Sequence, residues 1–350
     1  MDNDAEVLKH FGGIMANNLN TTLKIDDDIQ DSERMSFCHS PYVDINSLSS
    51  FKLPENATLN IMTINIQSIS AKFHSLVAFL SILNENKLSI DILNLQETWL
   101  SEAWLSDPDN LNLFQIPGYK LIPQGKICCA HGGLFTYVKD IYKATVRPLY
   151  KKSNLYEALF LDITSESFSS KVTLGNVYRP STKTSDSNTE IEAFIKQFKP
   201  IVEKLDREKS NLVISGDFNI NLLHTNQKEI YQDYFDMFIT RGLLPQATLP
   251  TRFSARSATL IDNIFCKTHI DRNRNISAIF VSKLSDHFPV FTCLDIIKKP
   301  KSCPKYVYVQ EKSPTAIHNF VSDVGDRLKK TNFSRDLFTD PNANYDTFQK

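Results

Sequence analysis

Five short apolar segments follow one another between residues 119 and 178. Most of the stretches that join them are too short to hold a helix. Strands joined by short connections pair as antiparallel neighbours, because parallel neighbours need a long crossover between them. This part of the chain therefore predicts a block of antiparallel strands. The segments are residues 119–123, 132–139, 142–150, 156–164 and 171–178.

Helices and strands alternate on both sides of this block. The segment AKFHSLVAFLSILNENK has apolar residues at helical spacing and lies between two apolar strands, LNIMTINI and DILNLQE. Two further helices and four strands follow the block. This order predicts an α/β fold with two mostly antiparallel sheets packed face to face and helices outside. The later helices are expected at 189–206 and 228–241, and the later strands at 211–219, 260–265, 276–281 and 288–296.

The two ends of the chain lack the pattern of a core. Residues 1–55 are rich in Asn, Asp and Ser without sustained periodicity, which predicts a mostly flexible tail. After residue 297 the basic, proline-containing KKPKSCPK predicts a linker, and the helical pattern of TAIHNFVSDVGDRLKK follows it without a core of its own. We therefore expect one folded domain at 56–297 and a linker segment at 298–350.

Composition excludes several classes of protein. The longest apolar stretch, LVAFLSIL, is too short to cross a bilayer, and the acidic N-terminus is unlike a secretory signal, so we expect no membrane partner. Six cysteines without CxxC spacing predict a reducing compartment, nucleus and cytoplasm. The net charge of −1 argues against a protein that coats nucleic acid. Residues 37–350 nevertheless hold 36 of the 39 basic and 32 of the 40 acidic side chains, an excess compatible with phosphate binding.

Several polar residues lie at or just past the end of an apolar strand, where the loops of layered α/β proteins gather along one rim and bind ligands. Asp262 differs, since it lies inside the apolar strand LIDNIF, where an ionised carboxylate is costly unless it is paired. His287 is its natural partner. The residues at strand ends are Asn65, Glu97, Tyr178, Asp217, Asn219, Asp286 and His287.

These residue types suit metal-assisted cleavage of a phosphoester. Mg²⁺ prefers carboxylate and amide oxygens and often binds only one or two protein carboxylates, of which Glu97 is the best candidate. Asp217 or His287 can orient or deprotonate the attacking water, and Asp262 can fix the tautomer of the histidine. Donors to the nonbridging oxygens of the phosphate are Asn65, Asn219, Tyr178 and His287.

Each residue also has a plainer interpretation. Glu97 can instead cap the segment that follows it, since ETWLSE resembles the start of a helix. Asparagines are common turn residues, and Tyr178 can simply close a strand. The adjacent Asp286 and His287 can be a metal or catalytic pair, half of a hydrolytic triad, or the polar start of a strand. A serine triad is disfavoured because no GxSxG motif is present. The double glycine after His131 can let a substrate approach or only start a strand.

Six motifs occur in order along the chain: NIQS, LQETW, VYRP, SGDFN, TLIDNIF and LSDHFPV. The set resembles the endonuclease/exonuclease/phosphatase superfamily over residues 59–297, and within it the apurinic/apyrimidinic-like endonuclease domain of non-LTR retrotransposons. ETWL, VYRP and LPTRF favour the retrotransposon branch, and the sequences flanking the domain resemble those of such elements. The resemblance implies the front part of a longer polyprotein whose reverse transcriptase is absent, or a truncated copy.

The resemblance further implies a four-layer α/β sandwich, Mg²⁺ as the cofactor with Mn²⁺ as a substitute, and hydrolysis of a DNA phosphodiester that leaves a 3′-hydroxyl. It implies that Asp217 orients the water and that Asp262 pairs with His287, which contacts the scissile phosphate as a base or as a charge stabiliser. The residues implied to bind the metal are Glu97, Asn65 and Asp286, those implied to hold the phosphate are Tyr178 and Asn219, and those implied to lie near the DNA are Arg252, Phe253 and Arg179.

We therefore expect an endonuclease that nicks double-stranded DNA to prime reverse transcription. It is expected to be monomeric as this fragment and to reach the element RNA through the missing polymerase. Gln67 stands where relatives specialised for base-loss repair carry an acid, which weakens a repair function. Two alternatives remain: a phosphatase of the same fold that acts on a small or lipid phosphoester, and a decayed copy without catalysis.

Overall fold

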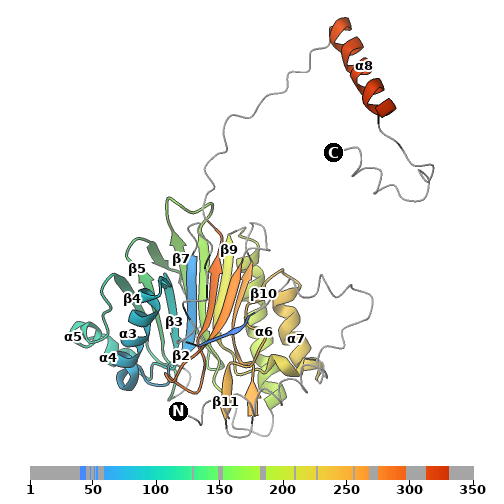
Figure 1. The fold of residues 1–350 in the computed structure, drawn as a ribbon. Coiled ribbons are helices and arrows are strands. Elements are labelled where there is room, and N and C mark those ends of the chain that lie inside the picture. Colours follow the sequence, from blue (N-terminus) through green and yellow to red (C-terminus); the bar gives the residue numbers. More distant parts are fainter. Residues whose placement is uncertain are drawn as a thin grey trace. The chain divides into compact units, whose positions relative to one another are not determined.

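The computed structural model describes two units of the chain, divided after Lys298 (Figure 1). The first unit holds two sheets with their helices, and the second holds helix α8 (Pro314–Lys330), as the helical pattern there predicts. In the part of the chain that the structure describes, no helix has the length and apolar character needed to span a membrane. The described residues are 40–44, 48, 51, 53, 59–127, 130–148, 153–181, 187–208, 210–225, 228–254, 257–267, 275–296 and 313–330.

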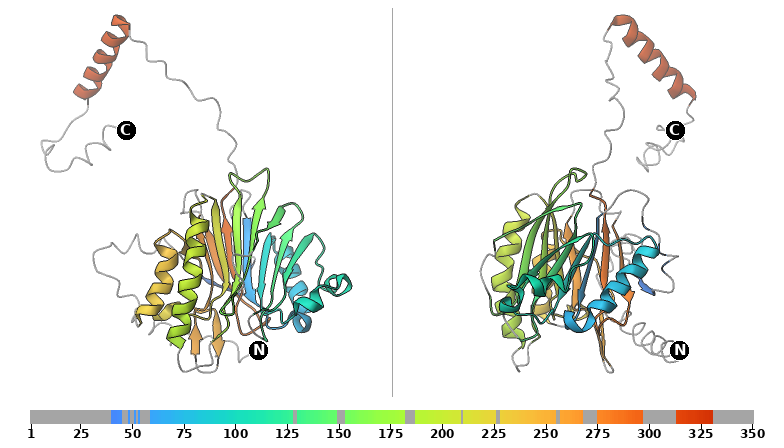
Figure 2. Two further views of the ribbon diagram at one scale, coloured as in Figure 1. Left: turned by 180° about the vertical axis from the view of Figure 1, so that it is seen from behind. Right: turned by 90° about the vertical axis from the view of Figure 1, so that its left-hand side faces the viewer.

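Two mixed sheets lie face to face in the first unit (Figures 1 and 2). Across the larger sheet the strands are β1 (Tyr42–Asp44), β14 (Ile276–Val281), β15 (Val290–Leu294), β2 (Leu59–Asn65), β3 (Ile92–Gln96), β5 (Leu134–Lys139) and β4 (Tyr119–Gln124). Across the smaller sheet they are β10 (Leu244–Pro245), β13 (Asp262–Lys267), β9 (Asn211–Asp217), β8 (Val172–Tyr178), β7 (Glu157–Thr164) and β6 (Lys143–Val146). A separate hairpin pairs β11 (Arg252–Ser254) with β12 (Ser257–Thr259).

Most neighbouring strands in these sheets are antiparallel, as the short connections predict. The parallel pairs are β1 with β14, β2 with β3, and β8 with β9. Helices cover the outer faces: α3 (Ile69–Glu85) packs on the larger sheet, and α6 (Ser187–Asp206) and α7 (Glu229–Ile239) pack on the smaller one (Figure 2). The predicted sandwich of four layers is therefore confirmed. Three short elements lie in connections: α4 (Glu102–Leu105), α5 (Pro108–Asn112) and the 3-10 turn η2 (Leu222–His224).

The strand β2 shows how the sequence builds these layers. Its side chains alternate between two apolar clusters: Leu59 and Ile61 point between the sheets, whereas Met62 and Ile64 point outward into the cluster that contains α3. Because both faces of the strand are buried, LNIMTINI is apolar on both faces where a half-exposed strand would alternate.

Toward one end of the sandwich, the layer between the sheets becomes polar. The inner positions of β2, β3, β8 and β9 change there from aliphatic to amide or hydroxyl side chains. Gln96 Nε2 donates to Asn176 Oδ1 over 2.6 Å, and Asn94 Nδ2 donates to Ser215 Oγ over 2.7 Å. Each bond joins one sheet to the other, and all four side chains are buried. These bonds fix the relative position of the sheets beside the polar strand ends.

Asn176 is expected to contribute strongly to the stability of this layer. Besides accepting from Gln96, its Nδ2 donates to the carbonyl of Phe135 over 3.0 Å and to Thr136 Oγ1 over 3.2 Å. Substituting alanine leaves these buried groups without a partner, so we expect Asn176→Ala to lower the free energy of unfolding by about 2–3 kcal/mol. Urea unfolding measures the change. The exposed Lys120→Ala serves as the control, and an equal response of both variants would contradict the assignment.

The folded part of the chain begins upstream of residue 56. β1 pairs in parallel with β14, Val43 is buried, and the Tyr42 hydroxyl donates to the carbonyl of Pro250 over 2.8 Å. The expectation of a flexible tail through residue 55 is therefore wrong for this stretch, because a strand of three residues is too short to show periodicity. Residues 1–39, 45–47, 49–50, 52 and 54–55 of the predicted tail lie outside the described residues, as do residues 298–312 and 331–350 of the predicted linker segment.

Candidate active site

The polar strand ends gather at one edge of the two sheets. The C-terminal ends of β2, β3, β8 and β9 lie there, and β13 begins there because it runs antiparallel to β9. In the smaller sheet, Asp217 has Tyr178 as its neighbour on β8 and Asp262 as its neighbour on β13. His287 lies just ahead of β15, which starts at the same edge of the larger sheet. Residues far apart in the sequence therefore meet at this edge.

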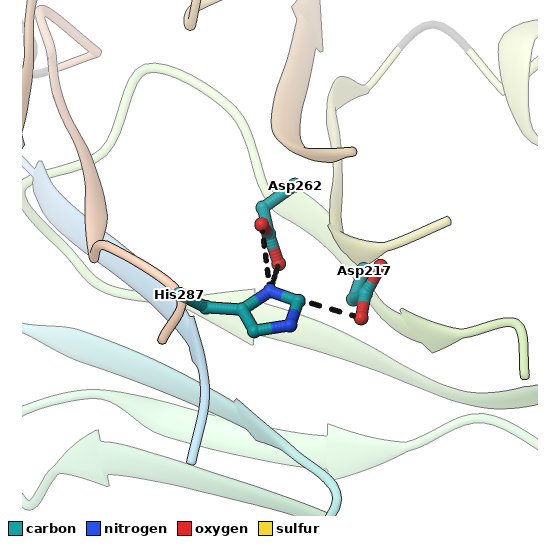
Figure 3. Close-up of side chains that lie close together, drawn as sticks. All are labelled: Asp217, Asp262 and His287. Carbon is teal, nitrogen blue, oxygen red and sulfur yellow. Dashed lines mark hydrogen bonds and ion pairs between the residues drawn. The ribbon is translucent and has the colours of Figure 1, made fainter. Parts of the chain in front are cut away.

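His287 and Asp262 form a buried pair (Figure 3). The Nδ1 atom of His287 lies 2.9 Å from each carboxylate oxygen of Asp262, and Thr251 Oγ1 donates to Asp262 Oδ2 over 2.7 Å. Because a carboxylate can only accept, Nδ1 carries the hydrogen of this bond. Nε2 is then the nitrogen that remains for a substrate. The predicted pairing of Asp262 with His287 is present in the structure.

Asp217 lies beside this pair and is fully buried. Its Oδ2 is 3.9 Å from His287 Nδ1 and accepts from Asn65 Nδ2 over 2.9 Å, while its Oδ1 accepts from the backbone N–H of Asn219 over 2.9 Å. Burial raises the pKa of the Asp217 carboxyl to about 7, and the neighbouring Asp262 carboxylate adds to the rise, whereas His287 and the hydrogen-bond donors oppose it. A carboxylate with this pKa can take up a proton near neutral pH.

The carboxylates around His287 favour the charged form of its imidazole. Burial, the largest single effect, lowers the pKa of His287, whereas the charge and the hydrogen bond of the Asp262 carboxylate raise it. Asp217 and Asp286 add to the rise, and the pKa reaches about 9. Nε2 lies 3.8 Å from Asp286 Oδ1, close to the exposed side of the site. The imidazole of the pair is thus positively charged at neutral pH, next to the negative Asp262 carboxylate.

The Glu97 carboxylate accepts from three side chains. Asn65 Nδ2 and the Tyr178 hydroxyl donate to Oε1 over 2.8 and 2.9 Å, and the Trp99 indole donates to Oε2 over 3.1 Å. The φ of Glu97 is 55°, in a left-handed region that costs about 1–2 kcal/mol for a residue with a side chain. The next helix starts only at Glu102, so Glu97 does not cap it. The strained backbone instead holds Glu97 at the end of β3, beside Asn65.

Arg179 supports the turn at GDFN from inside the protein. Asn219 has a φ of 49°, and its Nδ2 donates to the backbone carbonyl of Arg179 over 2.8 Å. The Arg179 guanidinium donates to the carbonyls of Phe218 and Asn219 over 3.3 Å each. Arg179 is only 3% exposed and its guanidinium binds the backbone of the turn, so its predicted contact with DNA stays a prediction. VYRP identifies an arginine beside the site, but the sequence does not show on which side of the turn the guanidinium lies.

Asp286 and Arg252 form an ion pair at the surface of the site. Arg252 Nε lies 2.9 Å from Asp286 Oδ2, and each side chain is 38% exposed. Phe253, the next residue on β11, is half-buried and has its ring centre 5.0 Å from that of Phe288. An isolated backbone bridge also joins Arg252 to His287. The β11–β12 hairpin therefore stands beside the buried histidine, with Arg252 and Phe253 at its base.

The amino-acid sequence matches the model of the Endonuclease/Exonuclease/phosphatase family over residues 62–287. The chain belongs to this family. The matched region starts within β2 and ends at His287, so it contains every residue placed at the site above. No curated protein sequence matches the chain.

Solved structures share the fold of this family member at low sequence identity. The AP endonuclease LMAP from Leishmania major is 16% identical, covers 81% of this chain and 99% of its own, and has a TM-score of 0.56. The endonuclease domain of TRAS1, a telomere-specific non-LTR retrotransposon, is 16% identical, covers 69% of this chain and 100% of its own, and has a TM-score of 0.50. At 16% identity, the similarity establishes the fold but not the substrate.

Some residues of this endonuclease/exonuclease/phosphatase site were not predicted from the sequence. Ser285 Oγ donates to the Asn65 carbonyl over 2.7 Å and accepts from the His287 backbone N–H over 3.0 Å. Lys72 interacts electrostatically with Asp286 and Glu97, which oppose the lowering of its pKa by burial. Lys72 lies in the first turn of α3, where a positive charge is unfavourable for the helix dipole. This unusual position is the sequence feature that could have identified Lys72 as a site residue. Trp99 and Thr251 were missed as well.

Two groups of side chains in the family member can hold a divalent cation. In the buried group, Nδ1 of His287 already lies 2.9 Å from both carboxylate oxygens of Asp262, so these ligand atoms are taken up by one another. The other group supplies carboxylate and amide oxygens, the ligands that a hard cation prefers, and it already attracts the ammonium of Lys72. We consider this second group the better fit. Among the described residues, the first group is Asp217, Asp262 and His287, with ligand atoms within 4.8 Å of one another. The second is the predicted set of Glu97, Asn65 and Asp286, in which Asn65 is hydrogen-bonded to Glu97 and Lys72 interacts with both carboxylates.

Proposed function

We propose that this chain is an Mg²⁺-dependent endonuclease that hydrolyses a phosphodiester of double-stranded DNA and leaves a 3′-hydroxyl, from which a non-LTR retrotransposon primes reverse transcription. One contact carries the proposal: Asn65 Nδ2 donates both to Glu97 Oε1, over 2.8 Å, and to Asp217 Oδ2, over 2.9 Å. It joins a metal-binding carboxylate of the larger sheet to a water-binding carboxylate of the smaller sheet. A phosphodiester bound beside Asn65 would therefore lie next to both carboxylates, Glu97 and Asp217.

Glu97 would hold the cation, with Asp286 and the Oδ1 atom of Asn65 as further ligands; this Oδ1 atom also accepts from the backbone N–H of Gln67 over 3.2 Å. Mg²⁺ suits these oxygens, and Mn²⁺ can replace it. When bound, the cation neutralises part of the negative charge of the phosphate and so favours attack on phosphorus. Tyr178 donates its one phenol hydrogen to Glu97 over 2.9 Å, and the hydroxyl can turn this hydrogen toward a phosphate that binds beside Glu97.

Asp217 orients the attacking water and accepts its proton, because Asn219 and Asn65 hold its two oxygens in place. The water oxygen bonds to phosphorus, the bond from phosphorus to the 3′-oxygen breaks, and this oxygen leaves as the 3′-hydroxyl with a proton from solvent. His287, held by Asp262 at Nδ1, donates through Nε2 to a nonbridging oxygen and stabilises the charge that develops there. This geometry favours His287 as a charge stabiliser over a base.

The remaining residues bind the substrate or support those that do. Asn219 and Tyr178 hold the phosphate, and Arg252 and Phe253 contact the DNA beside it from the β11–β12 hairpin. Arg179 acts as a positioning residue, since its guanidinium binds the backbone of the turn that carries Asn219.

The retrotransposon role is supported by ETWL, VYRP and LPTRF and by the flanking sequences that resemble such elements. The shared fold of the TRAS1 endonuclease domain agrees with it. On this proposal, residues 298–350 lead toward a reverse transcriptase that brings the element RNA, and the protein, monomeric as this fragment, is made in the cytoplasm and acts in the nucleus.

Purified protein is expected to convert supercoiled plasmid to open circle in Mg²⁺, and EDTA is expected to prevent it. Glu97→Gln keeps the shape of the side chain but removes its charge, so we expect nicking to slow about a hundredfold or more. Glu192→Gln, at an exposed position of α6, makes the same change away from the site and is expected to leave the rate unaltered. Extension of the nicked strand by a DNA polymerase tests for the 3′-hydroxyl.

Each other result has a defined meaning. Equal nicking by wild type and Glu97→Gln sinks the proposed role of the carboxylate. Intact plasmid together with hydrolysis of inositol phosphates identifies a phosphatase of the same fold. Tight DNA binding without turnover in Mg²⁺ or Mn²⁺ identifies a decayed copy.

A further inference from the structure

Trp99 is a large aromatic residue left partly exposed beside the proposed metal ligand. It is one of only two tryptophans in the chain, lies two residues after Glu97, and is 39% exposed. Its φ is 65°, in the left-handed region that a residue with a side chain adopts at a cost of about 1–2 kcal/mol. A strained backbone is retained where its surroundings fix it, and such strain is concentrated at functional sites. The exposed indole on a strained backbone therefore indicates a functional role for Trp99.

Three contacts fix the position of the Trp99 ring. Its Nε1 donates to Glu97 Oε2 over 3.1 Å, and its backbone N–H donates to the carbonyl of Gly132 over 2.9 Å. The ring of His131 lies against it, with centroids 5.2 Å apart and planes tilted by 50°. The indole therefore keeps one orientation, with its N–H toward the site and part of its surface open to solvent.

The segment that carries His131 is itself anchored by a buried carboxylate. Glu157, on β7 of the other sheet, is 1% exposed and accepts from the backbone N–H groups of Ile127 and Gly133 over 2.6 Å each. Charge-assisted bonds of this kind are strong when they are buried. The two aromatic rings thus rest on a support that exists before any substrate binds.

This arrangement suits the flat face of a nucleobase. Aromatic side chains that stack on bases accept any base, because every base has a π-face, and they act on single or locally opened strands. A small phosphoester or a lipid headgroup without an aromatic ring cannot stack on such a surface, so the surface does not raise its affinity. In a duplex, a base has to leave its neighbours before it can stack on a side chain, and this costs least where the base is unpaired or mismatched.

We propose that Trp99, braced by His131, is the residue on which one unstacked base of the substrate strand rests while the adjacent phosphate lies at Glu97. The inference rests on the proposed function and deepens it, since it names the form of DNA that the site takes. Substrates with an unpaired base next to the scissile phosphate are cut faster than fully paired ones. Trp99 also acts as a positioning residue for Glu97 through its N–H.

Fluorescence of Trp99 tests the contact without cleavage. Trp104→Phe removes the other tryptophan, whose ring packs on Phe114, and leaves Trp99 as the single tryptophan that emits. In EDTA, a short single-stranded oligonucleotide is expected to quench this emission, because stacked bases quench indole. An abasic oligomer with the same number of phosphates is expected to bind without quenching. Equal quenching by both, or none by either, overturns the proposal.

Two substitutions separate stacking from the positioning of Glu97. Trp99→Ala is expected to raise the Kd for the oligonucleotide, measured by anisotropy, and the KM for nicking about tenfold or more. Trp99→Phe keeps a ring but loses the N–H, so it is expected to retain most of the binding and to lower kcat. Ile141→Ala, at the exposed turn beyond the far end of β5, is the matched control and is expected to change neither. An unaltered KM in folded Trp99→Ala contradicts the proposal.

Failure of this inference is distinct from failure of the proposed function. Plasmid nicking without any quenching of Trp99 leaves the endonuclease in place and removes the stacking role. Quenching by the oligonucleotide without metal-dependent nicking keeps the stacking role and removes the catalysis.

Discussion

Replacing His287 by alanine is expected to lower the kcat of DNA nicking about a thousandfold. The variant loses Nε2, the imidazole nitrogen proposed to donate to the phosphate, and with it the positive charge that Asp262 maintains. Single-turnover nicking at saturating DNA measures the loss. We expect the affinity for DNA in EDTA to change little, because the side chain is 1% exposed and contributes mainly when charge develops in the transition state.

Two further variants make the His287 prediction specific. Removing His287 leaves the Asp262 carboxylate buried without its partner, so the unfolding curve of His287→Ala has to show that the protein is folded under assay conditions. Asp262→Asn retains a group that can bond to Thr251 and His287 but removes the charge, and we expect an intermediate loss of about tenfold to a hundredfold. His224→Ala makes the same change at an exposed histidine and controls for nonspecific effects. A kcat for His287→Ala within tenfold of wild type contradicts the assigned role.

Substituting alanine for Gly216 is expected to prevent stable folding. Gly216 lies in β9 with a φ of 147°, and a Cβ at this position would lie 1.8 Å from the backbone carbonyl oxygen of Val177 on the neighbouring strand β8. Backbone atoms in the centre of a sheet cannot move aside without breaking the ladder. We expect a loss of more than about 4 kcal/mol in the free energy of unfolding, seen as insoluble expression or a large fall in Tm.

Two other glycines separate the causes of this effect. Gly118 has a φ of 81° but no atom within 4 Å of an added Cβ, so Gly118→Ala measures the cost of the backbone conformation alone, about 1–2 kcal/mol. Gly325 lies in helix α8 with open space around it, and Gly325→Ala is expected to leave the Tm of the sandwich unaltered. Comparable losses at Gly216 and Gly118 would show that the clash with Val177 is relieved.

The layers of the fold were predictable because its central strands are buried on both faces and its helices on one. LNIMTINI and NLVISGDFN stand out as apolar runs that end in polar residues, and this pattern alone placed Asn65 and Asp217 at a common edge. The boundaries were less certain. The strand expected from residue 260 begins at Asp262, because Leu260 and Ile261 bond instead to the backbone of the segment that follows β9.

Other parts of the site could not be predicted because they depend on the direction of a side chain in three dimensions. Arg179 reads as a surface cation in VYRP, yet its guanidinium points beneath the turn. Thr251 and Ser285 are ordinary hydroxyl residues whose roles appear only when Asp262 and Asn65 are brought beside them. The left-handed backbone at Glu97 and Trp99 carries no glycine or asparagine to mark it.

The short strand β1 has a practical consequence for how the protein can be made. It covers the edge of β14, with the Ile279 N–H bonded to the Pro41 carbonyl over 3.0 Å, whereas the family match begins only at residue 62. A recombinant domain cut at that point would lose β1 and part of β2, and β14 would offer a row of unpaired backbone groups to other molecules. Such a fragment would be prone to aggregate even with an intact catalytic edge. A recombinant form of the protein should therefore start upstream of Ser40.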